Sequence, residues 1–229
     1  MQLTDRFGRK ISYLRLAVTD RCNLRCQYCM PAHGIDIVDR KELLSYKEMY
    51  RITRVLSELG VNKVRLTGGE PFVRKDFVNF LESLSFNDKL EEINITTNGA
   101  LIANHIDKLE ALNINAVNLS MDSLQRDKFA QITRRDVFVN VYDTFEKLEK
   151  ELYISVNIIA HNSTLNDITE FLNFLGTIKL SGIIFGDLGV YMIAKRLGLE
   201  SKLIYNPETL NTSFYDPKFW KRKGIKGIT

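Results

Sequence analysis

The sequence predicts an α/β protein arranged as a (β/α) barrel of about eight parallel strands. Short runs rich in β-branched residues alternate along the chain with segments in which apolar residues recur at helical spacing. This alternation produces βαβ units, whose strands are parallel. The composition, 45% hydrophobic and 26% charged residues, is that of a globular protein with a sizeable core. We therefore expect the functional residues at the carboxyl ends of the strands.

Eight short runs are predicted as strands because they combine β-branched or aromatic residues with other apolar side chains. The first of them reads YLRLAV, and the fourth reads AVNLSM. No helical segment follows the last run, so we expect the barrel to lack its final helix or to replace it with the segment before the first strand. The predicted strands are 13–18, 63–67, 92–97, 116–121, 153–160, 182–186, 202–206 and 225–229.

Five segments between these runs place apolar residues on one helical face. In the first of them Met49, Ile52 and Leu56 share that face, and in the last Ile168 and Leu172 do so. The predicted helices are 45–59, 75–84, 101–112, 138–152 and 165–175.

The charge and hydropathy of the chain limit its expected partners and location. The net charge of +4 is mild and suits an anionic small ligand, and no dense Lys/Arg tract indicates binding to nucleic acid. No apolar run approaches the ~20 residues that a membrane span needs. The first ten residues, MQLTDRFGRK, lack the apolar stretch of a secretory signal. We expect a cytoplasmic protein with neither a membrane nor a nucleic acid as partner.

All three cysteines lie in one stretch, DRCNLRCQYCMP, directly after the first predicted strand. An odd, clustered set fits a metal site or reactive thiols better than a disulfide framework. Cys22, Cys26 and Cys29 can bind three irons of a 4Fe–4S cluster and leave the fourth iron open for a substrate or cofactor. Zinc is the alternative, with His33 as the fourth ligand. The spacing favours iron–sulfur, because zinc sites usually pair C-x-x-C motifs or add paired histidines.

Four sequence blocks carry a family resemblance. They are LRLAVTDRCNLRCQYCMP, VRLTGGEPFVRKD, ITTNG and VNLSMDSL, in this order within residues 8–148. C-x-x-x-C-x-x-C after a first strand resembles the radical S-adenosylmethionine (SAM) superfamily. Together the blocks resemble its GTP 3′,8-cyclase family, which acts in molybdenum-cofactor synthesis. The resemblance implies a barrel of the radical SAM type, a 4Fe–4S cluster on the three cysteines, and an electron donor protein. The reduced cluster would cleave SAM to methionine and a 5′-deoxyadenosyl radical.

The resemblance also implies a set of residues that bind SAM. In TGGEP, Gly68 and Gly69 would let the backbone approach the cofactor closely, and Glu70 would accept from its ammonium group. Tyr28 would lie against the cluster or the adenine, and Ser120 matches a position that contacts SAM. The alternative for TGGEP is a tight βα turn with an acid at a helix start, and the alternative for Tyr28 is ordinary packing within the loop. Beside the cysteine motif, the SAM interpretation is favoured.

Arg15, Arg65 and Thr96 match positions that bind the GTP substrate in the family that the chain resembles. Both arginines lie in strand runs flanked by apolar residues, so we expect their side chains to point into the barrel. Buried arginine is rarely left unpaired, and either could hold an anionic substrate. The alternative is an internal salt bridge with Glu70 or Asp122. The nearby pair in ITRRD, Arg134 and Arg135, indicates a solvated turn or a phosphate contact.

The cyclase pattern weakens after residue 148. The resemblance implies a phosphate-binding lysine in the fifth strand, where this chain has Ser155, and a second cysteine-ligated cluster, whereas no cysteine follows Cys29. Residues 150–229 resemble instead the collagenase-like peptidase family, which includes prephenate-dependent tRNA hydroxylation enzymes. We expect a chimera of two domains, a radical SAM core at 1–149 and the second half of the barrel at 150–229.

The expected function is that of a radical SAM protein that cleaves SAM, resembles GTP 3′,8-cyclase and lacks its full activity. The alternative is a fused or designed barrel scaffold without catalysis. His161, Asp187 and Asn206 lie near strand ends of the second part. They could face the catalytic mouth or serve as turn and helix-cap residues.

Overall fold

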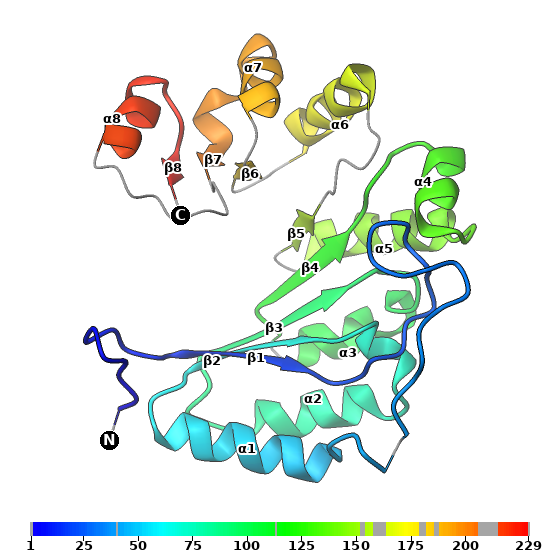
Figure 1. The fold of residues 1–229 in the computed structure, drawn as a ribbon, viewed down its shortest axis with the longest axis vertical. Coiled ribbons are helices and arrows are strands. Elements are labelled where there is room, and N and C mark those ends of the chain that lie inside the picture. The colour runs from blue at the N-terminus through cyan, green and yellow to red at the C-terminus, as the bar shows by residue number, and fades with distance from the viewer. Residues whose placement is uncertain are drawn as a thin grey trace. The chain divides into compact units, whose positions relative to one another are not determined.

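The chain divides into two compact units, Met1–Ile159 and Ala160–Thr229 (Figure 1). The structure is a computed structural model. It describes residues 2–39, 41–112, 114–151, 154–157, 164–178, 182–185, 188–205 and 215–228.

A parallel five-stranded sheet forms the centre of the first unit, and its strands follow one another in chain order. They are β1 (Tyr13–Ala17), β2 (Lys63–Thr67), β3 (Glu92–Thr97), β4 (Ala116–Ser120) and β5 (Ile154–Asn157). The helices of this unit are α1 (Tyr46–Glu58), α2 (Phe77–Ser85), α3 (Ile106–Ala111), α4 (Arg126–Thr133) and α5 (Phe138–Glu151), with 3₁₀ turns η1 (Pro71–Val73) and η2 (Ala103–His105).

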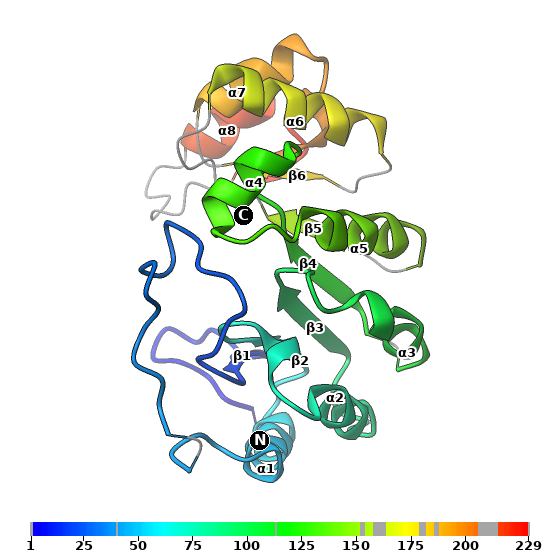
Figure 2. The ribbon, with the colours of Figure 1, turned by 90° about the vertical axis from the view of Figure 1, so that its right-hand side faces the viewer.

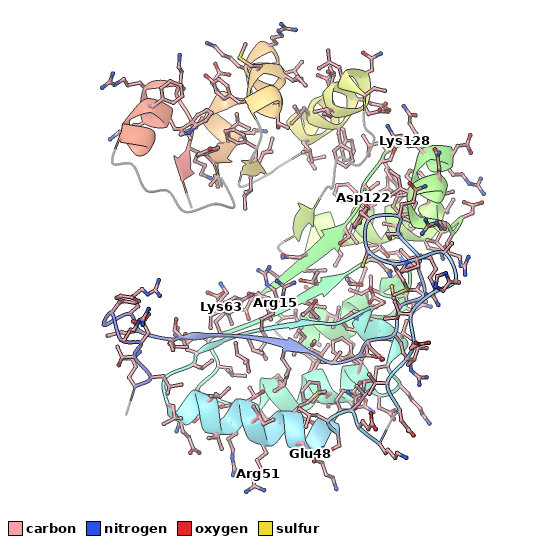
Figure 3. The ribbon with its side chains drawn as sticks, viewed as in Figure 1. Arg15, Glu48, Arg51, Lys63, Asp122 and Lys128 are labelled. Atoms are coloured by element: carbon pink, nitrogen blue, oxygen red, sulfur yellow. The ribbon has the colours of Figure 1, made fainter. Side chains whose placement is uncertain are left out.

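The two faces of this sheet differ in character. Val64, Leu66 and Ile95 are buried in a core that also contains apolar side chains of α1, α2 and α3. Figures 1 and 2 show these helices along one face of the sheet. The alternate strand residues are polar, and Arg15 and Lys63 stand on the face opposite α1 (Figure 3). Parallel sheets are usually covered by apolar residues on both faces, so the polar face is a candidate functional surface.

The second unit has a parallel sheet of its own, ordered β6 (Ile183–Phe185), β7 (Leu203–Tyr205) and β8 (Gly227–Ile228). Trp220 is buried, and its ring lies 4.4 Å from that of Tyr205, 5.2 Å from that of Tyr191 and 5.4 Å from that of Phe185, measured between centroids. This aromatic cluster gives the unit a core. Its helices are α6 (Leu165–Thr177), α7 (Leu188–Arg196), η3 (Glu200–Lys202) and α8 (Tyr215–Arg222).

The parallel α/β fold is confirmed. The prediction missed α4, α7 and α8, which are only eight or nine residues long and so contain few turns in which a periodic pattern can be recognised. The units divide after the predicted boundary at 149/150, because β5 pairs with β4 and belongs to the first unit. Closure into one barrel stays a prediction, since the strands belong to two sheets. Among the helices that the structure describes, none is both long and apolar enough to cross a membrane.

Candidate functional site

The carboxyl ends of β1 to β4 carry most of the residues that the sequence singled out. The register pairs Ala17 with Thr67 and Thr96 with Asn118, so the strands end at a common edge of the sheet. The segment that leaves β1 there is the cysteine loop, residues 18–45, whose described part contains neither helix nor strand.

The cysteine loop is hydrogen-bonded to the turn that follows β2. The amide of Gly69 donates to the carbonyl of Thr19, and that of Glu70 to the carbonyl of Arg21, both at 2.7 Å. A Cβ on Gly69 would come closer than 3.0 Å to the Arg21 carbonyl, and a Cβ on Gly68 would meet the Thr19 carbonyl in the same way. The two glycines therefore allow a direct contact between two backbones.

Arg74 closes the stem of the loop. Its guanidinium donates to the carbonyl of Val18 and, at 2.7 Å, to the carbonyl of Leu44, which lie at opposite ends of the loop. The following helix begins with a capping box, in which Ser45 and Glu48 exchange hydrogen bonds between side chain and backbone. The start and end of the loop are thus fixed to each other. Sequence analysis did not single out Arg74.

The other side of the loop lies against α4, as Figures 1 and 2 both show. Arg134 follows this helix and donates to the carbonyls of Arg25 and Met30, at 2.8 and 2.9 Å. Arg134 lies in the predicted turn, is half-buried, and binds two main-chain carbonyls of the cysteine loop. Arg135 is exposed.

The three thiols are partly desolvated. Cys22 and Cys26 are half-buried, and Cys29 is exposed. Burial, together with the negative charges of Asp122 and of the other two thiolates, raises the pKa of Cys26 to about 11. Burial also raises the pKa of Cys22, whose sulfur accepts from the Leu24 amide at 3.4 Å. A bound cation would stabilise the thiolate form of these side chains and so lower their pKa values.

The donor set fits an iron–sulfur cluster better than zinc. Three thiols lie on one loop, and amide hydrogens already donate to the Cys22 sulfur, as they do around thiolates of such clusters. His33 is exposed, and in the described part of the chain no group of three or more His, Cys, Asp or Glu side chains has the geometry of a metal site. The three thiols are the candidate ligands, and their sulfurs would have to converge to hold a cluster.

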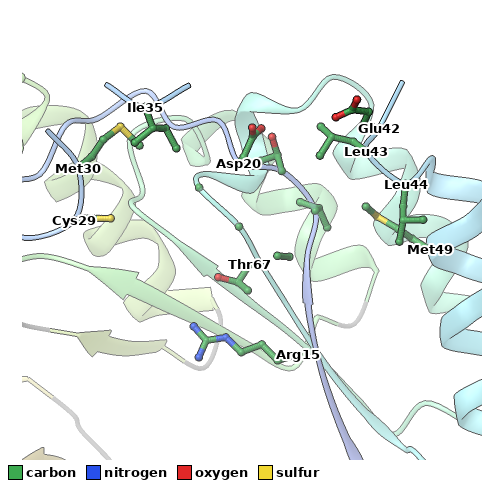
Figure 4. Close-up of a pocket in the computed structure, with 15 residues that line it drawn as sticks. Arg15, Asp20, Cys29, Met30, Ile35, Glu42, Leu43, Leu44, Met49 and Thr67 are labelled. Atoms are coloured by element: carbon green, nitrogen blue, oxygen red, sulfur yellow. The ribbon is translucent and has the colours of Figure 1, made fainter. Parts of the chain in front are cut away.

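A pocket of about 630 Å³ opens beside the loop. Cys29, Gly68, Gly69 and Arg15 line it, together with Asp20 (Figure 4). One carboxylate oxygen of Asp20 accepts from the Val38 amide at 2.8 Å, whereas the other is buried without a hydrogen-bond partner. Asp20 is an acceptor that sequence analysis missed, although an acid directly after a strand and two residues before a cysteine was a visible signal.

Glu70 lies inside the protein, with 1% of its surface exposed. Its carboxylate accepts from the Thr97 hydroxyl at 2.8 Å and from the amides of Asn98 and Phe72 at 2.7 and 3.2 Å. Burial raises the pKa of Glu70, although these three donors act in the opposite direction. The side chain ties the end of β2 to the end of β3, and it is not among the pocket-lining residues.

Tyr28 joins the loop to the end of β4. Its hydroxyl donates to a carboxylate oxygen of Asp122 at 2.7 Å, and Asp122 is buried. Burial and the charge of Asp122 together hold the pKa of Tyr28 well above its usual range. Ser120 is half-buried, two residues before Asp122.

The predicted substrate residues share the polar face of the sheet. The register sets Arg15 beside Arg65 and Arg65 beside Asn94, and Thr96 lies two residues further along β3. Among the described residues, neither arginine forms the internal salt bridge that was the alternative. Arg65 Nε and the Asn94 side-chain oxygen are buried and have no hydrogen-bond partner in the part of the chain that the structure describes. The face therefore offers unused donors and acceptors to a ligand.

The remaining candidates, His161, Asp187 and Asn206, lie outside the described residues.

Residues 16–175 match the radical SAM superfamily, and the chain belongs to it. Its sequence is similar to GTP 3′,8-cyclases: 44% identical over 174 residues to that of Desulforamulus reducens, covering 75% of this chain and 53% of the relative. The enzyme of Geobacter sulfurreducens is 46% identical over 143 residues, covering 62% of this chain and 44% of the relative. The resemblance predicted from the four blocks is confirmed. The match continues past residue 148, and the chain spans about half the length of these relatives.

Solved structures support the fold. Streptococcus suis SuiB bound to S-adenosylmethionine superposes with a TM-score of 0.62 at 15% identity, over 95% of this chain and 50% of that chain. HydG, a maturase of the [FeFe]-hydrogenase, superposes with a TM-score of 0.60 at 15% identity, over 94% of this chain and 56% of that chain. The peptidase resemblance of residues 150–229 stays a prediction.

We expect Gly69→Ala to destabilise the contact between the cysteine loop and β2. The added Cβ would collide with a main-chain carbonyl, which cannot rotate away, so the expected loss of unfolding free energy is about 1–3 kcal/mol. Urea denaturation measures it. Gly227→Ala is the control, because a Cβ there meets nothing within 4 Å. Equal midpoints for the two variants would show that the backbone contact is not needed.

Proposed function

We propose that this chain holds a 4Fe–4S cluster on Cys22, Cys26 and Cys29 and binds SAM beside it. One observation carries the proposal: the cysteine loop and the turn after β2 border the same pocket, so Cys29, Gly68 and Gly69 line a single cavity. Three thiolates leave one iron of such a cluster open for the amino and carboxylate groups of SAM. Membership of the radical SAM superfamily supports this assignment.

The reaction that we propose is reductive cleavage of SAM. When bound and reduced by an electron donor protein, the cluster supplies one electron that breaks the bond from the SAM sulfur to C5′, which yields methionine and a 5′-deoxyadenosyl radical. The residues of this chain bind the cluster and SAM and orient them toward each other. The loop presents the thiolates, and Gly68 and Gly69 bring the backbone to the pocket wall. Tyr28 and Ser120 are proposed contacts of SAM on the β4 side.

Asp20 is the proposed acceptor for the amino group of SAM. Its second carboxylate oxygen is buried at the pocket with no partner among the described residues, and an N–H of the iron-bound amino group would satisfy it with a charge-assisted hydrogen bond. Glu70 was the acceptor expected from the sequence, and its carboxylate already accepts three hydrogen bonds from protein donors. We assign Glu70 to holding the turn in shape and Asp20 to the ligand.

GTP is the proposed substrate, held on the polar face of the sheet by Arg15, Arg65 and Thr96. The similarity to GTP 3′,8-cyclases supports the choice, and Arg15 lines the same pocket as Cys29. A triphosphate would accept charge-assisted hydrogen bonds from both arginines. Ser155 lies in β5, where its backbone pairs with Asn118 of β4. It is uncharged at a position where the family resemblance implies lysine. We therefore propose that phosphate binding and cyclisation are weaker than in the relatives.

Anaerobic reconstitution with iron and sulfide tests the cluster site. The chain should take up about four irons and turn brown, and Cys26→Ala should hold none, because it removes one of only three thiolate ligands. His33→Ala is the matched control and should keep its iron. Stoichiometric zinc without iron, lost again in His33→Ala, would contradict the cluster and favour the zinc alternative. A colourless chain that folds cooperatively would favour a non-catalytic scaffold.

The Asp20→Asn variant tests the contact between the Asp20 carboxylate and the amino group of SAM. Asparagine can still accept from Val38, and it lacks the charge, so the affinity for SAM should fall roughly 10- to 100-fold. Calorimetry on the reconstituted protein measures the affinity. Asp36→Asn, an exposed acid of the same loop, should bind SAM like the native chain. Equal affinities in both variants would remove Asp20 from the site.

Arg65→Met tests the substrate contact. Methionine keeps the length of the side chain and removes the donors, and the affinity for GTP should fall roughly 10- to 100-fold. Arg51→Met is the control, since Arg51 is exposed on α1 (Figure 3). Calorimetric titration with GTP gives the comparison. If the native chain and both variants bind GTP equally, the polar face is not its site.

A further inference from the structure

Arg134 occupies an unusual backbone position. It is the residue that ends α4, and it adopts the left-handed conformation with φ 55° and ψ 26°. Glycine or asparagine usually stands at such a helix end, because other side chains are strained there. Residues held in this conformation persist where the surrounding contacts require them. The contacts of Arg134 give such a requirement.

The cysteine loop caps the carboxyl end of α4. The last carbonyls of a helix have no partner within the helix. Here the amide of Arg25 donates to the carbonyl of Thr133 at 3.0 Å, and the amide of Gln27 to that of Ile132 at 2.9 Å. The Gln27 side chain donates to the carbonyl of Gln131 at 2.8 Å. The loop is therefore docked on a rigid element at the point where Arg134 turns the chain.

The Arg134 guanidinium completes this docking from the other direction. Its Nη1 donates both to the carbonyl of Arg25 and to the carbonyl of Met30. One of these carbonyls directly precedes Cys26, and the other directly follows Cys29. Between them the amides of Cys29 and Met30 both donate to the carbonyl of Cys26, which forms a compact turn. One nitrogen atom thus joins the two ends of the segment that carries two of the three thiols.

We propose that Arg134 is a positioning residue that holds the Cys26–Cys29 turn ready for its cluster. This inference rests on the proposed cluster site. By bridging the two carbonyls, Arg134 limits the conformations of the turn before any iron binds, so less freedom is lost when the cluster forms. The strained backbone places the guanidinium, which explains why an arginine stands where glycine would be unstrained.

The competing explanation is that Arg134 only ends α4. A substitution by glycine distinguishes this role from that of holding the Cys26–Cys29 turn. Arg134→Gly relieves the left-handed strain and removes the guanidinium, so the helix end should be kept and the turn released. Arg134→Asn is the second variant, because asparagine tolerates the left-handed conformation and is too short to bridge the carbonyls. Arg135→Ala is the matched control, since Arg135 is the exposed neighbour and its guanidinium contacts only the Arg134 carbonyl among the interactions described.

Hydrogen exchange on the iron-free proteins, read by mass spectrometry, is the deciding measurement. Residues 24–31 should exchange at least about tenfold faster in both Arg134 variants than in the native chain and in Arg135→Ala, because two charge-assisted hydrogen bonds are lost. Residues 77–85 of α2 should exchange at the native rate in all four proteins. After reconstitution, the Arg134 variants should also lose iron faster to a chelator.

Native exchange of residues 24–31 in both Arg134 variants would overturn the inference. Faster exchange that is equal in the loop and in α2 would also overturn it, because it would indicate general destabilisation. Failure of the native chain to bind iron would contradict the proposed function, and the exchange of the iron-free loop would still decide whether Arg134 holds the turn.

Discussion

The site depends on a main-chain contact between two loops that leave neighbouring parallel strands. The cysteine loop has no helix or strand in its described part, and its internal hydrogen bonds form only short turns, so contacts with other segments are needed to fix its path. Two hydrogen bonds of 2.7 Å from Gly69 and Glu70 attach it to the turn after β2. This approach is possible only because residues 68 and 69 have no Cβ. The attachment brings the loop residues Asp20 and Cys29 to the pocket that Gly68 and Gly69 also line.

Two arginines then hold the loop, one at its stem and the other at the cysteine turn. Arg74 joins the carbonyls of Val18 and Leu44 at the stem, and Arg134 joins those of Arg25 and Met30 around the cysteine turn. In each case one guanidinium satisfies two main-chain acceptors that a loop would otherwise leave to water. Burial raises the pKa of Cys22 and of Cys26, so a cluster that binds these thiols would have to displace their protons.

Features that depend on a few neighbouring residues could be predicted from the sequence. Contacts between residues far apart along the chain could not. Strand periodicity located β1 to β4, and the cysteine spacing indicated the cluster, because each signal lies within a few residues. The turn at Arg134 was predicted, but its contacts with the cysteine loop were not, because they lie 104 and 109 residues away along the chain and α4 itself went unpredicted. Asp20 and Glu70 show the same limit. Both are acids after strands, and only the tertiary structure reveals that Glu70 has three protein donors whereas one oxygen of Asp20 has none.

Release of 5′-deoxyadenosine tests the central claim most directly. The reconstituted chain, reduced with dithionite in the presence of SAM, should form 5′-deoxyadenosine and methionine in equal amounts, quantified by liquid chromatography and mass spectrometry. The reaction should require the reductant and should be absent in Cys26→Ala. A chain that holds its full iron content, binds SAM and is reduced, yet forms no 5′-deoxyadenosine, would contradict the account.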